Sequence, residues 1–317
     1  MHFAAPKIRD QMGNRTDAKN ASVELLRDLI DYAGLFPPAS LAMATVVANY
    51  EAYLQSEWSW ILGRFVLPIS RLAEFQEKLA GLPASGPELA PWRLSVLLSN
   101  DPAADVALIR NFDAQTNGGA SGRRAGIESV EAKVANAADI SWLSQIIPAE
   151  LTAYFEVPLS SSAECVAAVA ACGRRAKIRT GGETADKFPT STSVVEFIRL
   201  CASAGVPFKA TAGLHHPLRS VNRFTYQLDS ASGIMHGFLN VFLAAAFLRA
   251  GMDQKLAVLL LEEQSPEAFR FEADEVIWLQ HRLTRNEIAD TRRDFAISFG
   301  SCSFTEPIDD LQSLYLL

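Results

Sequence analysis

From residue 60 onward, short runs of β-forming residues alternate with amphipathic helical stretches, and this alternation constrains the fold more than any other sequence feature. Such alternation is typical of a parallel sheet built from βα units. Eight strands are expected, over residues 61–68, 93–99, 126–134, 152–158, 175–181, 207–213, 257–263 and 295–300. Eight strands with intervening helices predict an α/β fold, a (β/α)8 barrel of the TIM type. A doubly wound open sheet is the alternative, because 257–263 reads equally well as a helix.

The chain before residue 58 has a different pattern. Residues 21–36 place apolar side chains at helical spacing after Asn20, a residue suited to N-capping. A second helix is expected over 39–56. These patterns predict three parts: a flexible N-terminal tail over 1–20, an N-terminal helical extension over 21–57 and the barrel over 58–317.

The charge balance narrows the partners. Lys and Arg total 29 against 36 Asp and Glu, a net charge of −7, and basic residues occur at most in adjacent pairs. A nucleic-acid backbone would be repelled on average, so we expect a small anionic molecule as partner and no nucleic acid. The four cysteines lie far apart, and the first twenty residues lack the apolar stretch of a signal peptide. Both features favour a cytoplasmic protein.

One apolar segment, 237–250, needs a buried environment. It is shorter than the roughly 20 residues that span a bilayer, and it contains Asn240 and Arg249. We therefore expect no membrane partner. The segment is interpreted as a helix that is buried in the core or in a homodimer interface.

Alternation along four consecutive strands places charged residues on one face. In β4-type segment 126–134, for example, Val130, Ala132 and Val134 form the apolar face that packs on helices, so the opposite face points into the barrel. The same parity on four strands directs inward Glu131 with Lys133, Tyr154 with Glu156, Lys177 with Arg179, and Lys209 with Thr211. Buried charge pairs stabilise poorly compared with apolar packing. This constellation therefore indicates a site for chemistry, with a purely structural ion-pair ladder as the alternative.

The end of the sixth predicted strand reads Lys209-Ala-Thr-Ala-Gly213. A lysine followed by Thr and Gly at a strand end resembles the K-T-S-T-G strand of deoxyribose-phosphate aldolase-like class I aldolases. The resemblance implies that Lys209 forms a Schiff base and that Lys177, a neighbouring cation, lowers its pKa. Glu156, Tyr154, Glu131 or Lys133 would then move protons. Lys209 as a phosphate or carboxylate anchor is the alternative.

Two adjacent histidines, His215 and His216, follow that strand. Either could transfer protons, and His215 is our candidate for a catalytic role. Together with Glu131 and Glu156, a histidine could instead hold a divalent metal, although no H-x-x-H or H-x-H spacing supports a metal site. No dinucleotide or P-loop glycine motif occurs, so no organic cofactor is expected.

Small residues at the end of the last strand suit an anion site. Ser301 and Ser303 are expected to bind the anionic group of the substrate, together with Arg179 and Thr211. Cys302 between them is interpreted as an inert buried thiol. The leading hypothesis is an enzyme, a lyase or isomerase, that acts on a small anionic carbonyl or sugar-phosphate-like compound. A metal-dependent lyase or hydrolase and a ligand-binding barrel without catalysis are the alternatives.

Overall fold

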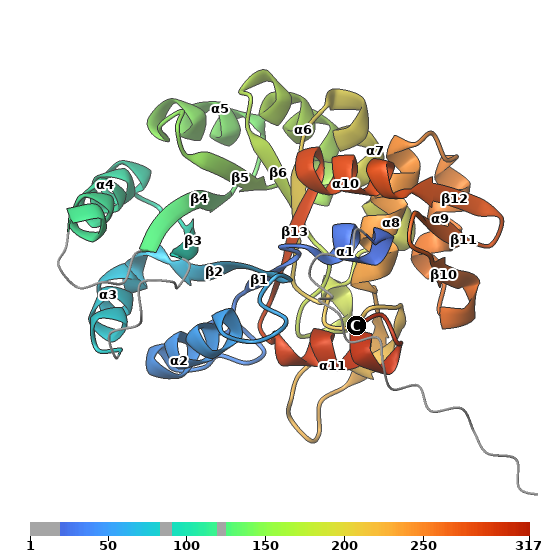
Figure 1. Ribbon diagram of the computed structural model, residues 1–317. Coiled ribbons are helices and arrows are strands. Elements are labelled where there is room, and N and C mark those ends of the chain that lie inside the picture. Colours follow the sequence, from blue (N-terminus) through green and yellow to red (C-terminus); the bar gives the residue numbers. More distant parts are fainter. Residues whose placement is uncertain (1–19, 83–90, 119–124) are drawn as a thin grey trace, which may run out of the picture.

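The structure is a computed structural model that describes residues 20–82, 91–118 and 125–317; the predicted tail over 1–20 lies almost wholly outside them. Eight parallel strands close into a barrel in the order β1-β13-β7-β6-β5-β4-β3-β2, with helices around it (Figure 1). The barrel strands are β1 (Ile30–Tyr32), β2 (Leu62–Pro68), β3 (Trp92–Leu97), β4 (Ala125–Lys133), β5 (Thr152–Glu156), β6 (Arg175–Arg179), β7 (Phe208–Thr211) and β13 (Ala296–Ser301). The predicted (β/α)8 barrel is confirmed, and the open sheet is excluded.

The helices begin and end where the local sequence supplies capping groups. The side chains of Asn20, Asn136, Thr190 and Thr284 each accept a hydrogen bond from a backbone amide in the first turn, and Gly205 ends its helix with φ +64°. The helices are α1 (Ala21–Leu26), α2 (Met43–Leu54), α3 (Leu72–Ala80), α4 (Pro102–Gly118), α5 (Ala137–Ile146), α6 (Ser162–Ala171), α7 (Ser191–Ala204), α8 (Phe238–Arg249), α9 (Gln254–Glu262), α10 (Arg285–Asp294) and α11 (Thr305–Ser313).

The long connection between β7 and β13 carries two small antiparallel sheets besides its helices. Strands β8 (Ser220–Arg223) and β9 (Ser232–Met235) form a hairpin, and β10 (Phe269–Phe271), β11 (Glu275–Trp278) and β12 (His281–Thr284) form a three-stranded sheet. Within the described ranges, no helix is long and apolar enough to cross a membrane. Helix α8 is buried in the chain itself along Phe238 to Phe247, which confirms the expected burial of this apolar segment.

Two secondary-structure predictions are wrong. Residues 21–36 are not one helix, because α1 stops at Leu26, Asp28 adopts φ +50° and the chain then enters β1. Residues 30–32 of the predicted helical extension are therefore a barrel strand. The expected strand over 257–263 is helix α9, in which Ala257, Leu260 and Leu261 are buried at helical spacing. The first barrel strand thus replaces the missing eighth one.

A buried guanidinium holds the seam between the first and last barrel strands. Arg292 of α10 donates hydrogen bonds to the carbonyl oxygens of Leu25 and Arg27, which precede β1, and of Ala296 and Ile297 in β13. The arrangement gives buried carbonyl groups at the beginning of both strands a charged donor. Arg292 therefore fixes two segments from opposite ends of the chain side by side.

Candidate active site

The central feature inside the barrel is a lysine held by two carboxylates. Nζ of Lys209 lies 2.6 Å from Oδ2 of Asp31 and 2.6 Å from Oε1 of Glu131, and the side chain is almost completely buried. The ring of Tyr154 lies beside it, with its centroid 5.4 Å from Nζ. Strands β7, β1, β4 and β5 thus meet through their inward side chains.

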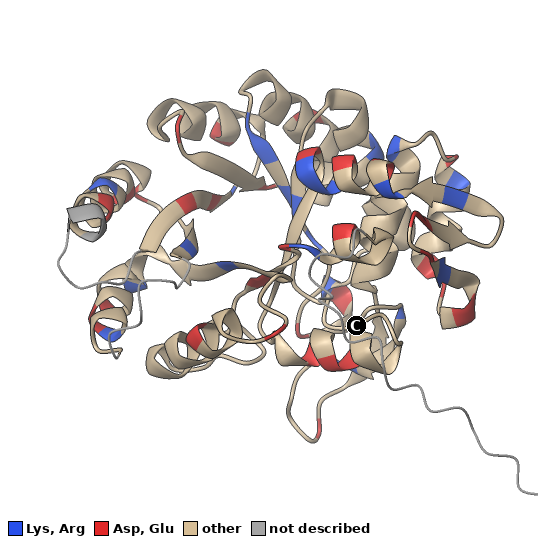
Figure 2. Ribbon diagram, in the orientation of Figure 1, with Lys and Arg blue, Asp and Glu red and all other residues tan. Residues whose placement is uncertain are grey.

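A second lysine extends this arrangement toward the mouth of the barrel. Nζ of Lys177 lies 2.8 Å from Oε2 of Glu131 and 2.8 Å from Oε2 of Glu156. Glu156 also pairs with Arg179, whose Nε lies 3.1 Å from Oε1. We call the resulting series of six alternating charges the charge chain; it runs through Asp31, Lys209, Glu131, Lys177, Glu156 and Arg179. Figure 2 shows acidic and basic positions on the barrel strands, including β4 and β6.

Hydroxyl and amide groups satisfy the remaining carboxylate oxygens. Oδ1 of Asp31 accepts the backbone N–H of Arg64 at 2.7 Å, and Oδ2 accepts the hydroxyl of Ser298 at 2.8 Å. Oε1 of Glu131 accepts the hydroxyl of Ser95 at 2.7 Å. Because every buried carboxylate oxygen has a donor, the charges can remain inside the barrel.

These contacts keep the innermost groups charged. Burial alone would raise the pKa of Asp31 and of Glu131, but the neighbouring lysines outweigh it and hold both pKa values below their usual range. Burial likewise disfavours the charged form of Lys209, yet Asp31 and Glu131 raise its pKa above the usual value. The expectation that Lys177 lowers the pKa of Lys209 is therefore wrong, because the two carboxylates decide the direction.

A cavity of about 450 Å³ lies above the charge chain. Lys177, Glu131 and Glu156 form its charged floor, and its walls include the apolar side chains of Leu98 and Trp142. Lys209 does not line this cavity and lies beneath it. Of the two buried lysines, only Lys177 therefore reaches the space where a ligand can bind.

A neighbouring cavity of about 390 Å³ shares two residues with the first, Lys133 and Glu156. Arg179 and Lys187 also line it. Lys133 is exposed at the junction of the two cavities and has no carboxylate partner among the described residues. An anion that binds at this junction would meet a cation without first breaking an ion pair.

The remaining predicted residues take different places. The structure brings Lys133 to the cavity, outside the charge chain. Tyr154 is inside the barrel, but its hydroxyl accepts a hydrogen bond from Arg175 at the start of β6, 3.0 Å away, so it points away from the strand ends. Thr211 ends β7 and, like Ser301 opposite it at the end of β13, lines none of the described cavities. Ser303 accepts the backbone N–H of Glu306 and caps α11.

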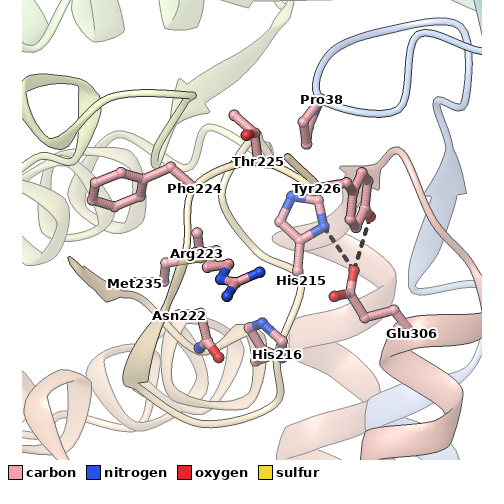
Figure 3. Close-up of a pocket in the computed structure, with 10 residues that line it drawn as sticks. All are labelled: Pro38, His215, His216, Asn222, Arg223, Phe224, Thr225, Tyr226, Met235 and Glu306. Atoms are coloured by element: carbon pink, nitrogen blue, oxygen red, sulfur yellow. Dashed lines mark hydrogen bonds and ion pairs between the residues drawn. The ribbon is translucent and has the colours of Figure 1, made fainter. Parts of the chain in front are cut away.

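The two histidines line a separate pocket, at the β8–β9 hairpin and α11 (Figure 3). Nδ1 of His215 lies 3.4 Å from Oε2 of Glu306, and Nδ1 of His216 lies 2.7 Å from Oδ2 of Asp310. The alternative metal set of Glu131, Glu156, His215 and His216 is therefore not assembled in one place. Within the described residues, no group of three or more His, Cys, Asp and Glu side chains is arranged to hold a metal ion.

Sequence reasoning missed Asp31, the carboxylate at the inner end of the charge chain. Its strand has only three residues, and the surrounding apolar pattern resembles a helix. One signal was available: the inward faces of the four strands carry Lys133, Lys177, Arg179 and Lys209 but only two glutamates. A buried lysine requires an acid, so another strand had to supply one.

The barrel fold is consistent with an enzyme, but the same fold carries many chemistries. No protein-family model matches the chain, and the comparison with curated proteins gives no match either. The argument for a specific reaction therefore comes from the geometry of the charge chain and its cavity.

Proposed function

We propose that this protein is an enzyme that forms an imine between Lys177 and the carbonyl group of a small anionic substrate. The observation that carries the proposal is the position of Lys177, between Glu131 and Glu156 on the floor of the cavity. Catalytic sites in such barrels lie at the carboxyl ends of the strands, which is where β6 presents Lys177. The resemblance to class I aldolases suggests this chemistry for a barrel lysine, and the cavity moves the role from Lys209 to Lys177.

The first step requires a neutral amine. A proton passes from the Lys177 ammonium to the Glu156 carboxylate, the nitrogen attacks the carbonyl carbon, and the former carbonyl oxygen takes up the proton to give a carbinolamine. A further proton to the hydroxyl then expels water and leaves an iminium ion. The net reaction converts one ammonium and one carbonyl into one iminium and one water, so the positive charge beside Glu131 and Glu156 is retained.

The iminium then acts as an electron sink. Glu156 is the base closest to Lys177 on the cavity side, and it can remove a proton from the carbon or hydroxyl next to the imine carbon. Removal from carbon leads to isomerisation, and removal from a β-hydroxyl leads to cleavage of a carbon–carbon bond. Lys209 stays protonated in this scheme and keeps Glu131 ionised beneath the imine.

Lys133 and Arg179 supply the anion site in this proposal. Both line the second cavity, which adjoins the floor of the first at Glu156. A carboxylate or phosphate held there would place a nearby carbonyl group over Lys177. The prediction that Ser301 and Ser303 hold the anion is replaced, because neither lines either cavity and Ser303 caps α11.

Reductive trapping tests the proposal. The protein is incubated separately with pyruvate, acetaldehyde and glyceraldehyde 3-phosphate, reduced with borohydride and mapped by peptide mass spectrometry. We expect a stoichiometric adduct on Lys177 with at least one compound. K177R keeps the positive charge but cannot form the imine, so its adduct should disappear, whereas K187M, which changes an exposed lysine, should leave it intact.

An adduct on Lys209 in the wild-type protein would restore the original assignment and overturn ours. Modification spread over surface lysines, unchanged in K177R, would also reject the imine route. In that case the charge chain has a structural role, and the barrel binds its ligand without covalent chemistry.

A further inference from the structure

A second pocket lies on another side of the barrel mouth and shares no lining residue with the two cavities at the charge chain. It has a volume of about 270 Å³ and lies at the β8–β9 hairpin and the start of α11 (Figure 3). This volume suits a ligand smaller than a typical drug molecule. The pocket has its own polar groups, which the proposed reaction does not use.

The most buried of these groups is His215, with only 8% of its surface exposed. One ring nitrogen, Nδ1, faces Oε2 of Glu306, and the hydroxyl of Tyr226 donates to the same oxygen at 3.0 Å. The other ring nitrogen, Nε2, points away from Glu306 and has no hydrogen-bond partner among the described residues (Figure 3). Glu306 therefore fixes the ring orientation and leaves one nitrogen for a ligand.

His215 carries a proton at neutral pH. Burial alone would lower its pKa, but contacts with Cys302 and Glu306 raise the pKa to about 9. Nε2 is then a charged N–H donor. This donor is half-surrounded by protein, so an acceptor that binds it is partly shielded from water.

A guanidinium supplies the second positive charge. Arg223, the last residue of β8, lines the pocket and has no carboxylate partner among the described residues. The other charged groups that line or adjoin the pocket are Glu306, which pairs with His215, and Asp310, which pairs with His216. One positive charge is left over, although the chain as a whole carries −7.

Apolar side chains complete the lining. Phe224, Met235 and Pro38 contribute to the same pocket as the two donors. A bare inorganic ion would leave these surfaces without contact. A ligand with a negatively charged end and a small apolar body matches both parts of the lining.

We propose that this pocket is a second binding site, for a small organic anion whose carboxylate or phosphate group contacts Nε2 of His215 and the guanidinium of Arg223. The proposal is independent of the imine chemistry at Lys177, because the two sites have no residue in common. Carboxylates and phosphate esters present the same oxygen acceptors to these donors. Binding measurements decide between them.

Isothermal titration calorimetry of the full chain with benzoate, phenyl phosphate and neutral benzamide tests the site. We expect one of the anions to bind with one-to-one stoichiometry and benzamide to bind at least tenfold more weakly. R223M and H215Q should each reduce the affinity at least tenfold. R270M, which removes an exposed arginine from β10, and K177R should leave the affinity within twofold of the wild-type value.

The choice of variants keeps the test decisive. Arg223 is exposed, so R223M removes a charge without opening the core, and circular dichroism should show an unchanged melting curve. Binding of only one of the two anions identifies its chemical class. Absence of binding by both anions at millimolar concentration, or an affinity unaffected by R223M and H215Q, would overturn the proposal.

Discussion

Nζ of Lys209 contacts Oδ2 of Asp31 at 2.6 Å although 178 residues separate them, and the contact joins β7 to β1 through the barrel interior. The hydroxyl of Ser298, on the strand between them, donates to the same carboxylate oxygen. The first strand, only three residues long, is therefore held by side-chain contacts as well as by its backbone ladder.

Removing the shared carboxylate should be costly. In E131Q, Lys177 and Lys209 each lose one of two anionic partners while remaining buried, and we expect the free energy of unfolding to fall by about 3 kcal/mol. E128Q is the matched control on the same strand, because Glu128 forms ion pairs at the surface, and its cost should be about 1 kcal/mol or less. Urea denaturation measures both. Equal losses in the two variants would contradict the assigned role of Glu131.

Acid should weaken the charge chain. The pKa values of Asp31 and Glu131 are lowered in the folded protein, so their stabilising effect is complete above the ordinary values of 3.8 and 4.5 and is lost as the pH falls through the lowered values. We expect the free energy of unfolding to decrease as the pH falls from 5 to 3. D31N lacks one of these groups, so its curve should be less steep. Parallel curves for D31N and the wild type would show that Asp31 does not contribute.

Gly63 on β2 makes room for the Asp31 carboxylate. A Cβ atom at position 63 would lie 2.3 Å from Oδ1 of Asp31, so G63A must displace the group that Lys209 contacts. We expect a loss of about 2 kcal/mol in the free energy of unfolding. At Gly126 on β4, nothing lies within 4 Å of the corresponding Cβ, and G126A should change the value by no more than about 0.5 kcal/mol. A G63A variant as stable as G126A would show that Asp31 can shift freely.

The titration of His215 can be measured directly. Its raised pKa means that its stabilising contribution is present below pH 6.5 and disappears as the pH rises through about 9. In an NMR titration of the imidazole resonances, E306Q should lower the pKa of His215, because it removes the charge next to Nδ1. D309N changes an exposed acid of the same helix and should leave the pKa in place. An unchanged titration in E306Q would mean that Glu306 does not control the ring.

Regular alternation made most of the barrel predictable. On β4 to β7, apolar side chains that pack on helices alternate with charged ones, so parity alone placed Lys177 and Lys209 inside. Parity gives no depth along the barrel axis, and it could not show that Lys209 lies beneath the cavity while Lys177 lines its floor. It also fails for very short strands: in β1 all three residues are buried, so the neighbourhood of Asp31 shows no alternation.

The pairing of β1 with β13 has a consequence for synthesis of the chain. A ribosome releases the N-terminal segment first, so Asp31 emerges 267 residues before Ser298, which donates to its carboxylate. Until that partner strand exists, the first strand has a free edge that could pair with another nascent chain. The charge of Asp31 in the middle of this strand keeps it hydrated during the delay, because an unpaired carboxylate resists burial in a non-native core. The residue that is most deeply buried in the finished barrel is thus the one that protects its strand while the barrel is still open.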